Sequence, residues 1–251
     1  MGNLSGLELA IMIVSGLIVV GLVVALIVQI VLIVKYKKFN KTPLQSGLSS
    51  QQTARTLLDA NGLTNVQIKK LGFFRRILLF GNHYSVMRKT IYLRKNIIDS
   101  SSVTAVGIAT QKVCLAIQHK NKDKSFIFRY VLQILTLFTP LLFYVSIAVG
   151  LIIDIVTKFS GLPTIIGLFV GLGFYLLTFI LQIVNIKVEK KANEQAVEVL
   201  KSANIFNENE ITTLQELLKL YIISDIIILV LSILKLILQI LKILARSKKS
   251  K

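Results

Sequence analysis

The sequence has one cysteine, two histidines and no tryptophan among its 251 residues. The single thiol, Cys114, excludes an intrachain disulfide framework, and a lone cysteine is typically a small buried apolar residue. His83 and His119 are the only imidazoles, so any site with two histidine ligands would need both of them. The absence of tryptophan, together with many lysines, isoleucines and asparagines, favours a bacterial origin.

Acidic residues are also scarce. Twelve Asp and Glu stand against 30 Lys and Arg, which gives a formal charge of +18, while 54% of the residues are hydrophobic. A soluble domain of this length would be less apolar, so the excess is predicted to lie in a lipid bilayer. Basic residues are then expected in cytoplasmic loops and on surfaces facing anionic lipid. They form no nucleic-acid-binding motif, so no nucleic-acid partner is expected.

The first hydrophobic segment, residues 7–34, is interrupted only by Glu8 and Gln29 and is long enough to cross about 30 Å of hydrocarbon. A cleaved signal peptide would need a basic start and a much shorter apolar core. No Lys or Arg precedes the segment, whereas several lysines follow it at once: Lys35, Lys37, Lys38 and Lys41. This asymmetry predicts an N-terminus outside the cell and polar segments in the cytoplasm.

The remaining pattern predicts a multi-pass cell-membrane protein of five segments. In order, these are an N-terminal transmembrane anchor over 1–36, a cytoplasmic segment over 37–125 with a helix at 101–119, a transmembrane hairpin over 126–186, cytoplasmic charged helices over 187–216, and a hydrophobic amphipathic helix with a basic tail over 217–251. Pro140 is expected to kink the hairpin, and Gly167 and Gly171 form a Gly-x-x-x-Gly that allows close helix packing.

Two stretches leave alternatives open. The last helix carries a polar stripe: Asp225, Ser232, Lys235, Gln239, Lys242 and Arg246. It could cross the membrane, lie in the interface, or cross with its stripe facing protein, and we favour the last. Residues 73–80, FFRRILLF, could form a buried strand with a charged bend or insert at the membrane surface.

Four stretches in chain order share motifs with a known family. They are ARTLLDANGL at 54–63, NHY at 82–84 with KTIYL at 89–93, SVTAVGIATQKVCLAIQH at 102–119 and VEKKA at 188–192. They resemble A-R-x-x-L-D-x-N-G-L, D-H-Y with K-x-V-x-L, S-x-A-A-x-G-x-A-A-H-E-V-G-H-A-x-Q-H and V-E-F-x-A of the membrane-embedded neutral zinc metallopeptidases called YugP-like. The resemblance implies a mainly α integral membrane protein with three or four transmembrane helices, a cytoplasmic zincin-like helical segment and a few short strands.

In that family, two imidazoles one helical turn apart bind zinc, and the carboxylate between them activates the bound water. Here the three positions hold Gln111, Lys112 and Leu115. An amide, an ammonium and an isobutyl group do not form a zinc site, and the resemblance leaves only Glu189, at the third ligand position. We therefore predict no catalytic residue, no metal ligand and no cofactor.

The surviving polar groups suggest two hypotheses. Lys112 and Glu189 could form an ion pair in place of a coordination bond, because a partly buried carboxylate needs a charge partner. Alternatively, both side chains are solvated. A compensating metal site would need His83, His119 and Glu189 together, and the alternative is that both imidazoles are structural.

The predicted function is that of a catalytically inactive membrane metallopeptidase homologue, a pseudopeptidase that binds or scaffolds other proteins, and hence not an enzyme. Its predicted partners are the lipid bilayer and either another protein or a second copy of the chain. One alternative is a membrane zinc metallopeptidase that cleaves membrane-associated peptides through a non-standard site. The other is a membrane interaction protein or small-molecule pathway, suggested by charged residues in or beside apolar segments: Asp154, Asp225, Lys235 and Lys242.

Overall fold

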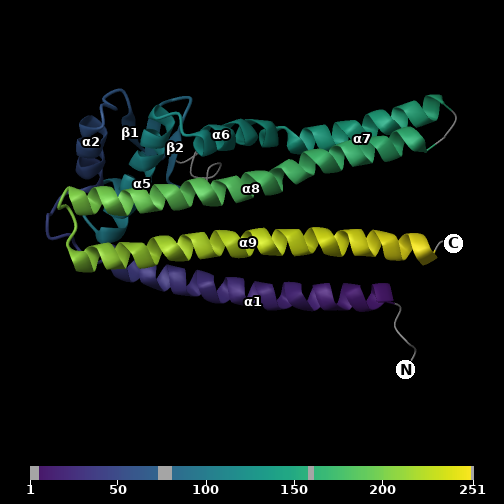
Figure 1. The fold of residues 1–251 in the computed structure, drawn as a ribbon, viewed down its shortest axis with the longest axis horizontal. Helices are drawn as coiled ribbons and strands as arrows, with labels where there is room; N and C mark the ends of the chain where they lie inside the picture. Colours follow the sequence, from purple (N-terminus) through teal and green to yellow (C-terminus); the bar gives the residue numbers. More distant parts are fainter. Residues whose placement is uncertain (1–5, 73–80, 158–160, 250–251) are drawn as a thin grey trace. The chain divides into compact units, whose positions relative to one another are not determined.

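The computed structural model describes residues 6–72, 81–157 and 161–249. In these ranges the chain is mainly helical, with one small three-stranded sheet, as the sequence predicts (Figure 1). The chain divides into two compact units, Met1–Ile117 with Lys190–Lys251 and Gln118–Glu189. We describe each unit by itself.

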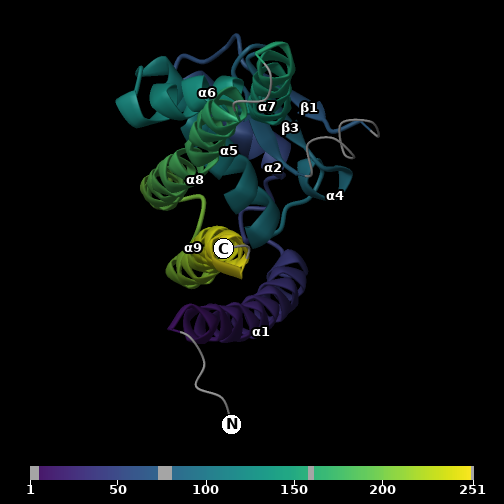
Figure 2. The ribbon, with the colours of Figure 1, turned by 90° about the vertical axis from the view of Figure 1, so that its right-hand side faces the viewer.

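The longest feature of the first unit is an antiparallel pair of helices, α1 (Gly6–Asn40) and α9 (Glu208–Lys249). They lie side by side in both views (Figures 1 and 2). A Cβ at Gly21 would stand 2.6 Å from the Leu231 side chain, so glycine allows the close approach. Two polar contacts fix the register: the Gln29 amide donates to the Ser224 hydroxyl at 2.6 Å, and Lys35 pairs with Glu216 at 2.6 Å.

A small α/β element follows α1. It contains α2 (Ser50–Ala60), β1 (Gln67–Lys70), β2 (His83–Ser85), β3 (Thr90–Leu93) and the short helix α4 (Lys95–Ile98). The strand order is β1-β3-β2, with β1 parallel and β2 antiparallel to β3. The central strand β3 is buried along its whole length, as expected for a strand paired on both edges.

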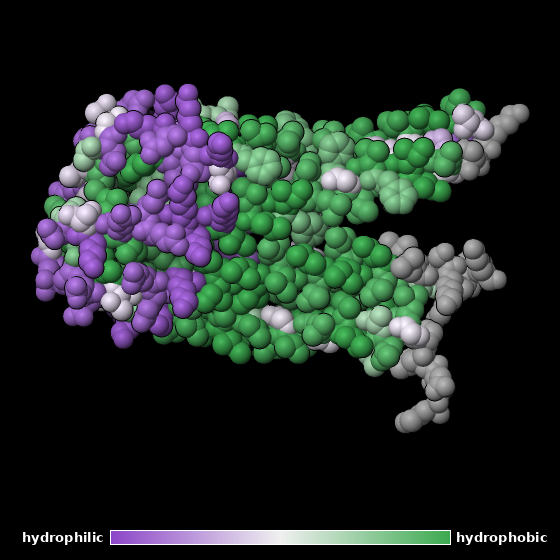
Figure 3. All heavy atoms as spheres, viewed as in Figure 1, coloured by the Kyte–Doolittle hydropathy of each residue, from purple (hydrophilic) through white to green (hydrophobic). Residues whose placement is uncertain are grey.

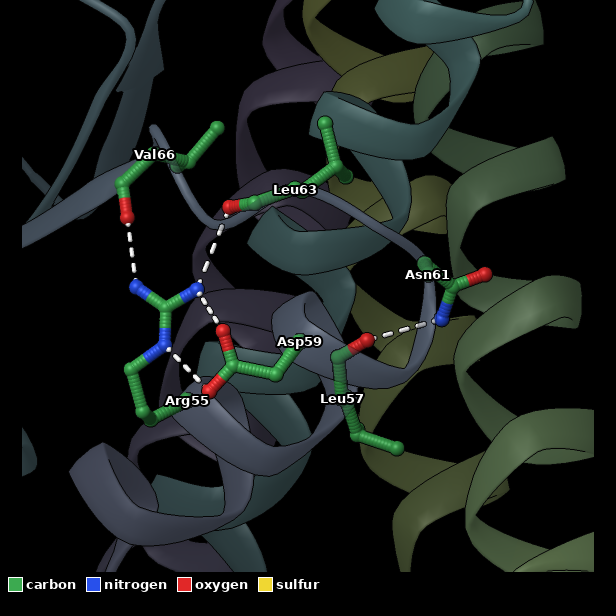
Figure 4. Close-up of polar contacts among 6 residues, drawn as sticks. All are labelled: Arg55, Leu57, Asp59, Asn61, Leu63 and Val66. Atoms are coloured by element: carbon green, nitrogen blue, oxygen red, sulfur yellow. Dashed lines mark hydrogen bonds and ion pairs between the residues drawn. The ribbon is translucent and has the colours of Figure 1, made fainter.

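The motif at 54–63 is a structural clamp (Figure 4). The Arg55 guanidinium pairs with Asp59 at 2.6 Å and donates to the carbonyl oxygens of Leu63 at 3.1 Å and Val66 at 2.7 Å. The chain reverses at Gly62, whose φ of +64° favours glycine. The arginine therefore ties α2 to the start of β1, which accounts for an Arg and an Asp four residues apart on one helix.

Helix α5 (Val103–Lys120) passes through the core of the first unit. Two buried clusters contact it, one formed with α2 and the sheet, the other with the α8–α9 turn. A Cβ at Gly107 would stand 2.2 Å from Leu214 of α9, so the two helices meet there. Helix α9 begins with a capping box, in which Asn207 and Glu210 exchange hydrogen bonds of 2.8 and 2.9 Å.

The second unit contains α6 (Lys124–Leu137), α7 (Thr139–Val156) and the first part of α8 (Leu162–Ser202). A break after α6 bends the helix axis by 47°, close to Pro140, where a kink was predicted. Helices α7 and α8 form the predicted close hairpin: a Cβ at Gly167 would stand 2.3 Å from the Ser146 carbonyl oxygen, and one at Gly171 would stand 2.9 Å from Phe143. Asp154, 3% exposed, accepts hydrogen bonds from the backbone and hydroxyl of Thr164.

Within the described residues, three helices are long and apolar enough to cross a membrane: Gly6–Asn40, Leu162–Ser202 and Glu208–Lys242. The bent pair Lys124–Leu137 and Leu141–Val156 is a fourth candidate if it counts as one span. Figure 3 shows hydrophobic residues covering most of the α1–α9 pair, with hydrophilic residues gathered at the end near α2. These helices, 35 to 41 residues long, agree with the predicted three or four transmembrane helices.

Two of the sequence-based predictions concern residues that the structure does not describe, and one predicted boundary between segments is absent. The proposed strand or membrane insertion at 73–80 lies outside the described residues, as does the end of the basic tail at 250–251. The predicted membrane segment up to residue 186 and the charged helix after it form one continuous helix, α8. No proline or glycine interrupts residues 174–202, so nothing in the local sequence ends the helix where its polarity changes.

The hairpin makes a direct prediction. Gly167→Ala is expected to lower the free energy of unfolding by about 1–3 kcal/mol, because its new methyl group would overlap a backbone carbonyl that cannot move aside. Gly173→Ala is the matched control, since nothing lies within 4 Å of a Cβ there. Denaturation in detergent micelles would compare them, and equal stability of the two variants would contradict the close packing.

Candidate functional site

Helix α5 is buried on almost every face. All residues from Ser102 to Ala116 are buried except Lys112, which is half-buried. The Ser102 hydroxyl accepts a hydrogen bond from the Ala105 N–H at 3.2 Å and so caps the first turn. This is the helix on which the sequence resemblance places a metal site. The helix itself is present and is packed into the core.

The three positions to which the sequence resemblance assigns zinc binding and water activation lie in this buried helix. Gln111 is 7% exposed and Leu115 is 2% exposed, and the two are one turn apart on the same face. Zinc sites are built from imidazole, thiolate and carboxylate groups, usually with three protein ligands when the site is catalytic. Gln111, Lys112 and Leu115 supply none of these groups, so the residues present at these positions do not fit a zinc ion.

Both histidines make local contacts with aromatic rings. The His83 ring stacks on Tyr92 with centroids 5.1 Å apart, and its Nδ1 lies 3.1 Å from the Gly81 carbonyl oxygen. The His119 ring stacks on Phe126 with centroids 5.7 Å apart. Among the described residues, no three His, Cys, Asp or Glu side chains gather closely enough to hold a metal ion.

Glu189 has a strong cationic partner. The Arg129 Nη1 lies 2.9 Å from its Oε1, and the two side chains are only 8% and 18% exposed. The same nitrogen lies 3.3 Å from the Asn185 amide oxygen, and the guanidinium carbon lies 4.8 Å from the centre of the Phe126 ring. The arginine therefore neutralises the carboxylate at the third ligand position. The predicted pair of Lys112 with Glu189 stays a prediction.

Cys114 offers no nucleophile. It is 1% exposed, and burial raises the pKa of its thiol to about 12. The thiol is therefore protonated at neutral pH, and the reactive thiolate does not form. This agrees with its interpretation as a small buried apolar residue.

Arg129 is not singled out in the sequence analysis. Its partnership with Glu189 joins residues 60 positions apart, which no local pattern encodes. A signal was available, because an ionisable residue inside an apolar segment generally requires a partner in the same region. Glu189 and Asn185 are the polar residues of the neighbouring helix α8 that meet this requirement.

The ion pair makes a second prediction. Arg129→Met is expected to lower the free energy of unfolding by about 3–5 kcal/mol, because it leaves the Glu189 carboxylate buried without its guanidinium. Glu189→Gln should act similarly, and the double variant Arg129→Met/Glu189→Met should cost less than the sum of the two. Lys190→Gln removes the exposed pair with Glu194 and should change little. An Arg129→Met protein as stable as the parent would contradict a strong pair.

Comparisons with known proteins bear on the whole chain. Residues 13–245 match a family model described as "Putative neutral zinc metallopeptidase". The chain is 25% identical over 179 residues to the "Putative membrane protease YugP" of Bacillus subtilis (strain 168), which covers 70% of this chain and 72% of the relative. No solved structure matches.

These matches correct one prediction. The substitutions at Gln111, Lys112 and Leu115 led us to predict that the protein is not an enzyme, and that prediction is wrong, because the family is one of peptidases and the match extends over nearly the whole chain. Three positions carried too much weight against a family match that extends over residues 13–245. The name of the relative also supports membrane association, in agreement with the apolar helices. The chain belongs to the family described as "Putative neutral zinc metallopeptidase".

Proposed function

We propose that the protein binds membrane-associated polypeptide segments beside the bilayer and holds them there as a binding or scaffolding member of its family. The observation that carries this proposal is the state of α5. The helix keeps its place in the core, whereas Gln111, Lys112 and Leu115 supply no zinc ligand. A peptidase must bind a polypeptide before any bond is cleaved, and that step needs no metal at these three positions.

A second function is favoured by the family match. In this alternative, the protein cleaves membrane-associated peptides through ligands outside the Gln111, Lys112 and Leu115 set. The match over residues 13–245 supports it. Its weakness is chemical, because Arg129 already neutralises Glu189, the carboxylate to which the resemblance assigns a ligand role.

One experiment separates the two functions. Fluorescein-labelled casein is added to the protein in lipid nanodiscs, with zinc or with a chelator, and both anisotropy and the release of small fluorescent fragments are followed. The first function predicts a rise in anisotropy that a chelator does not change. Release of fragments that stops with the chelator supports the second function, and neither signal would contradict both.

The same preparations test the three positions on α5. The variant Gln111→His/Lys112→Glu/Leu115→His restores two imidazoles one turn apart, and it is expected to hold about one more zinc per chain than the parent. Gln111→His alone is the control, because one added imidazole does not make a site. Metal analysis after gel filtration measures both, and an unchanged zinc content in the triple variant would show that the helix lacks the geometry of the family site.

We also propose a topology, with the N-terminus outside and residue 35 onward in the cytoplasm. The lysines that directly follow the first span support it. Helix α9 runs antiparallel to α1, with Glu216 beside Lys35 and Leu231 beside Gly21. If α1 crosses the membrane, the same path takes α9 across, so that its C-terminal end emerges on the outer side.

Labelling of introduced cysteines checks this topology. In a Cys114→Ser background, Leu9→Cys and Lys242→Cys are expected to react with a membrane-impermeant maleimide on intact cells. Lys38→Cys is the matched control and should react only after the cells are opened. Protection of Lys242→Cys on intact cells would show that α9 does not cross, and labelling of Lys38→Cys would reverse the orientation.

A further inference from the structure

A basic pocket of about 680 Å³ lies at the turn between α5 and α6. Its lining residues all belong to the unit Gln118–Glu189, and they are His119, Lys120, Lys122, Lys124, Ile127, Phe128 and Val131. We propose that this pocket binds an anionic phospholipid, with the phosphate among the lysines and an acyl chain along α6. The proposal is independent of the proposed polypeptide binding.

The polar half of the pocket suits an anion. Three lysines and a histidine fall within six consecutive residues, and no acidic side chain is part of the lining. The nearest carboxylate in the sequence, Asp123, accepts a hydrogen bond from the Phe126 N–H at 3.1 Å and so caps α6. Basic pockets beside transmembrane helices are the usual binding sites of anionic headgroups.

The turn that carries these lysines has a defined backbone. Lys122 adopts a φ of +51°, and its N–H donates to the His119 carbonyl oxygen at 3.1 Å. The next N–H, that of Asp123, donates to the Gln118 carbonyl oxygen at 3.0 Å. Successive hydrogen bonds of this kind close a helix end and fix where the following side chains begin. The lysines are therefore gathered by the fold before any ligand arrives.

The other half of the pocket selects a lipid over a soluble anion. Ile127, Phe128 and Val131 are 37%, 50% and 47% exposed, and the same face continues to Ile134 and Leu135 at 40% and 48%. The opposite face of α6 is buried, as shown by three residues: Phe126, Arg129 and Leu132. A free phosphate would leave the apolar wall in water, whereas an acyl chain covers it. Lysines above an apolar helix face are typical of a membrane interface.

The absence of tryptophan from the chain permits a local test. Phe128→Trp places one fluorophore in the pocket, and Val230→Trp places one on α9, at a residue that is similarly exposed. Each variant is reconstituted in phosphatidylcholine bilayers that contain brominated phosphatidylglycerol or brominated phosphatidylcholine, and quenching gives the relative affinity of the two lipids. The Phe128→Trp probe is expected to favour phosphatidylglycerol about fivefold or more, the factor for one lysine near an anionic surface. The Val230→Trp probe should show no preference.

Charge variants test whether the pocket lysines cause the preference for phosphatidylglycerol. In the Phe128→Trp protein, Lys120→Gln/Lys122→Gln/Lys124→Gln is expected to abolish the preference. The control Lys69→Gln/Lys70→Gln/Lys95→Gln removes the same charge elsewhere and should retain it. Equal quenching by the two lipids at Phe128→Trp overturns the proposal. So does a preference that survives loss of the three pocket lysines, or one that both charge variants abolish.

Discussion

The burial of α5 is the constraint on which the first unit depends. The sheet and α2 pack on one side of this helix, and the α8–α9 turn packs on another, so every residue from Ser102 to Ala116 except Lys112 is buried. A helix buried all round has no side that faces solvent, so each side chain must match the space that the surrounding residues leave. Gly107 shows this most clearly, because a Cβ there would stand 2.2 Å from the Leu214 side chain. Leu115 and Cys114 then serve packing, in the helix to which the sequence resemblance assigns a metal site.

In the apolar helices, the constraint is that polar side chains need hydrogen-bond partners within the protein. Lipid offers no hydrogen bonds, so polar groups on membrane helices must be satisfied by other helices. Gln29 bonds to Ser224, Asp154 bonds to Thr164, and Arg129 pairs with Glu189. Glycines at helix crossings let the backbones approach closely enough for such contacts. Asp154, one of the charges that suggested a small-molecule pathway, therefore has a structural partner within the chain.

Local sequence signals predicted the local structure well. The Gly-x-x-x-Gly at Gly167 and Gly171 depends on neighbouring residues, and the close packing that it predicts is present. Local patterns did not predict contacts between residues that are far apart in the sequence. Arg129 with Glu189 and Gly107 with Leu214 join positions 60 or more apart, so only the fold reveals them. The class of the protein followed from four ordered motifs, whereas its activity was misjudged from three side chains.

The central claim is that the face of α5 carrying Gln111 and Leu115 is packed as core, and that Arg129 takes the charge of Glu189. A cryo-EM structure of the protein in lipid nanodiscs with saturating zinc tests it most directly. The account predicts protein atoms alone around Gln111 and Leu115, and a guanidinium within hydrogen-bonding distance of the Glu189 carboxylate. Density for a metal ion bound to the Glu189 carboxylate, with Arg129 turned away, would contradict it.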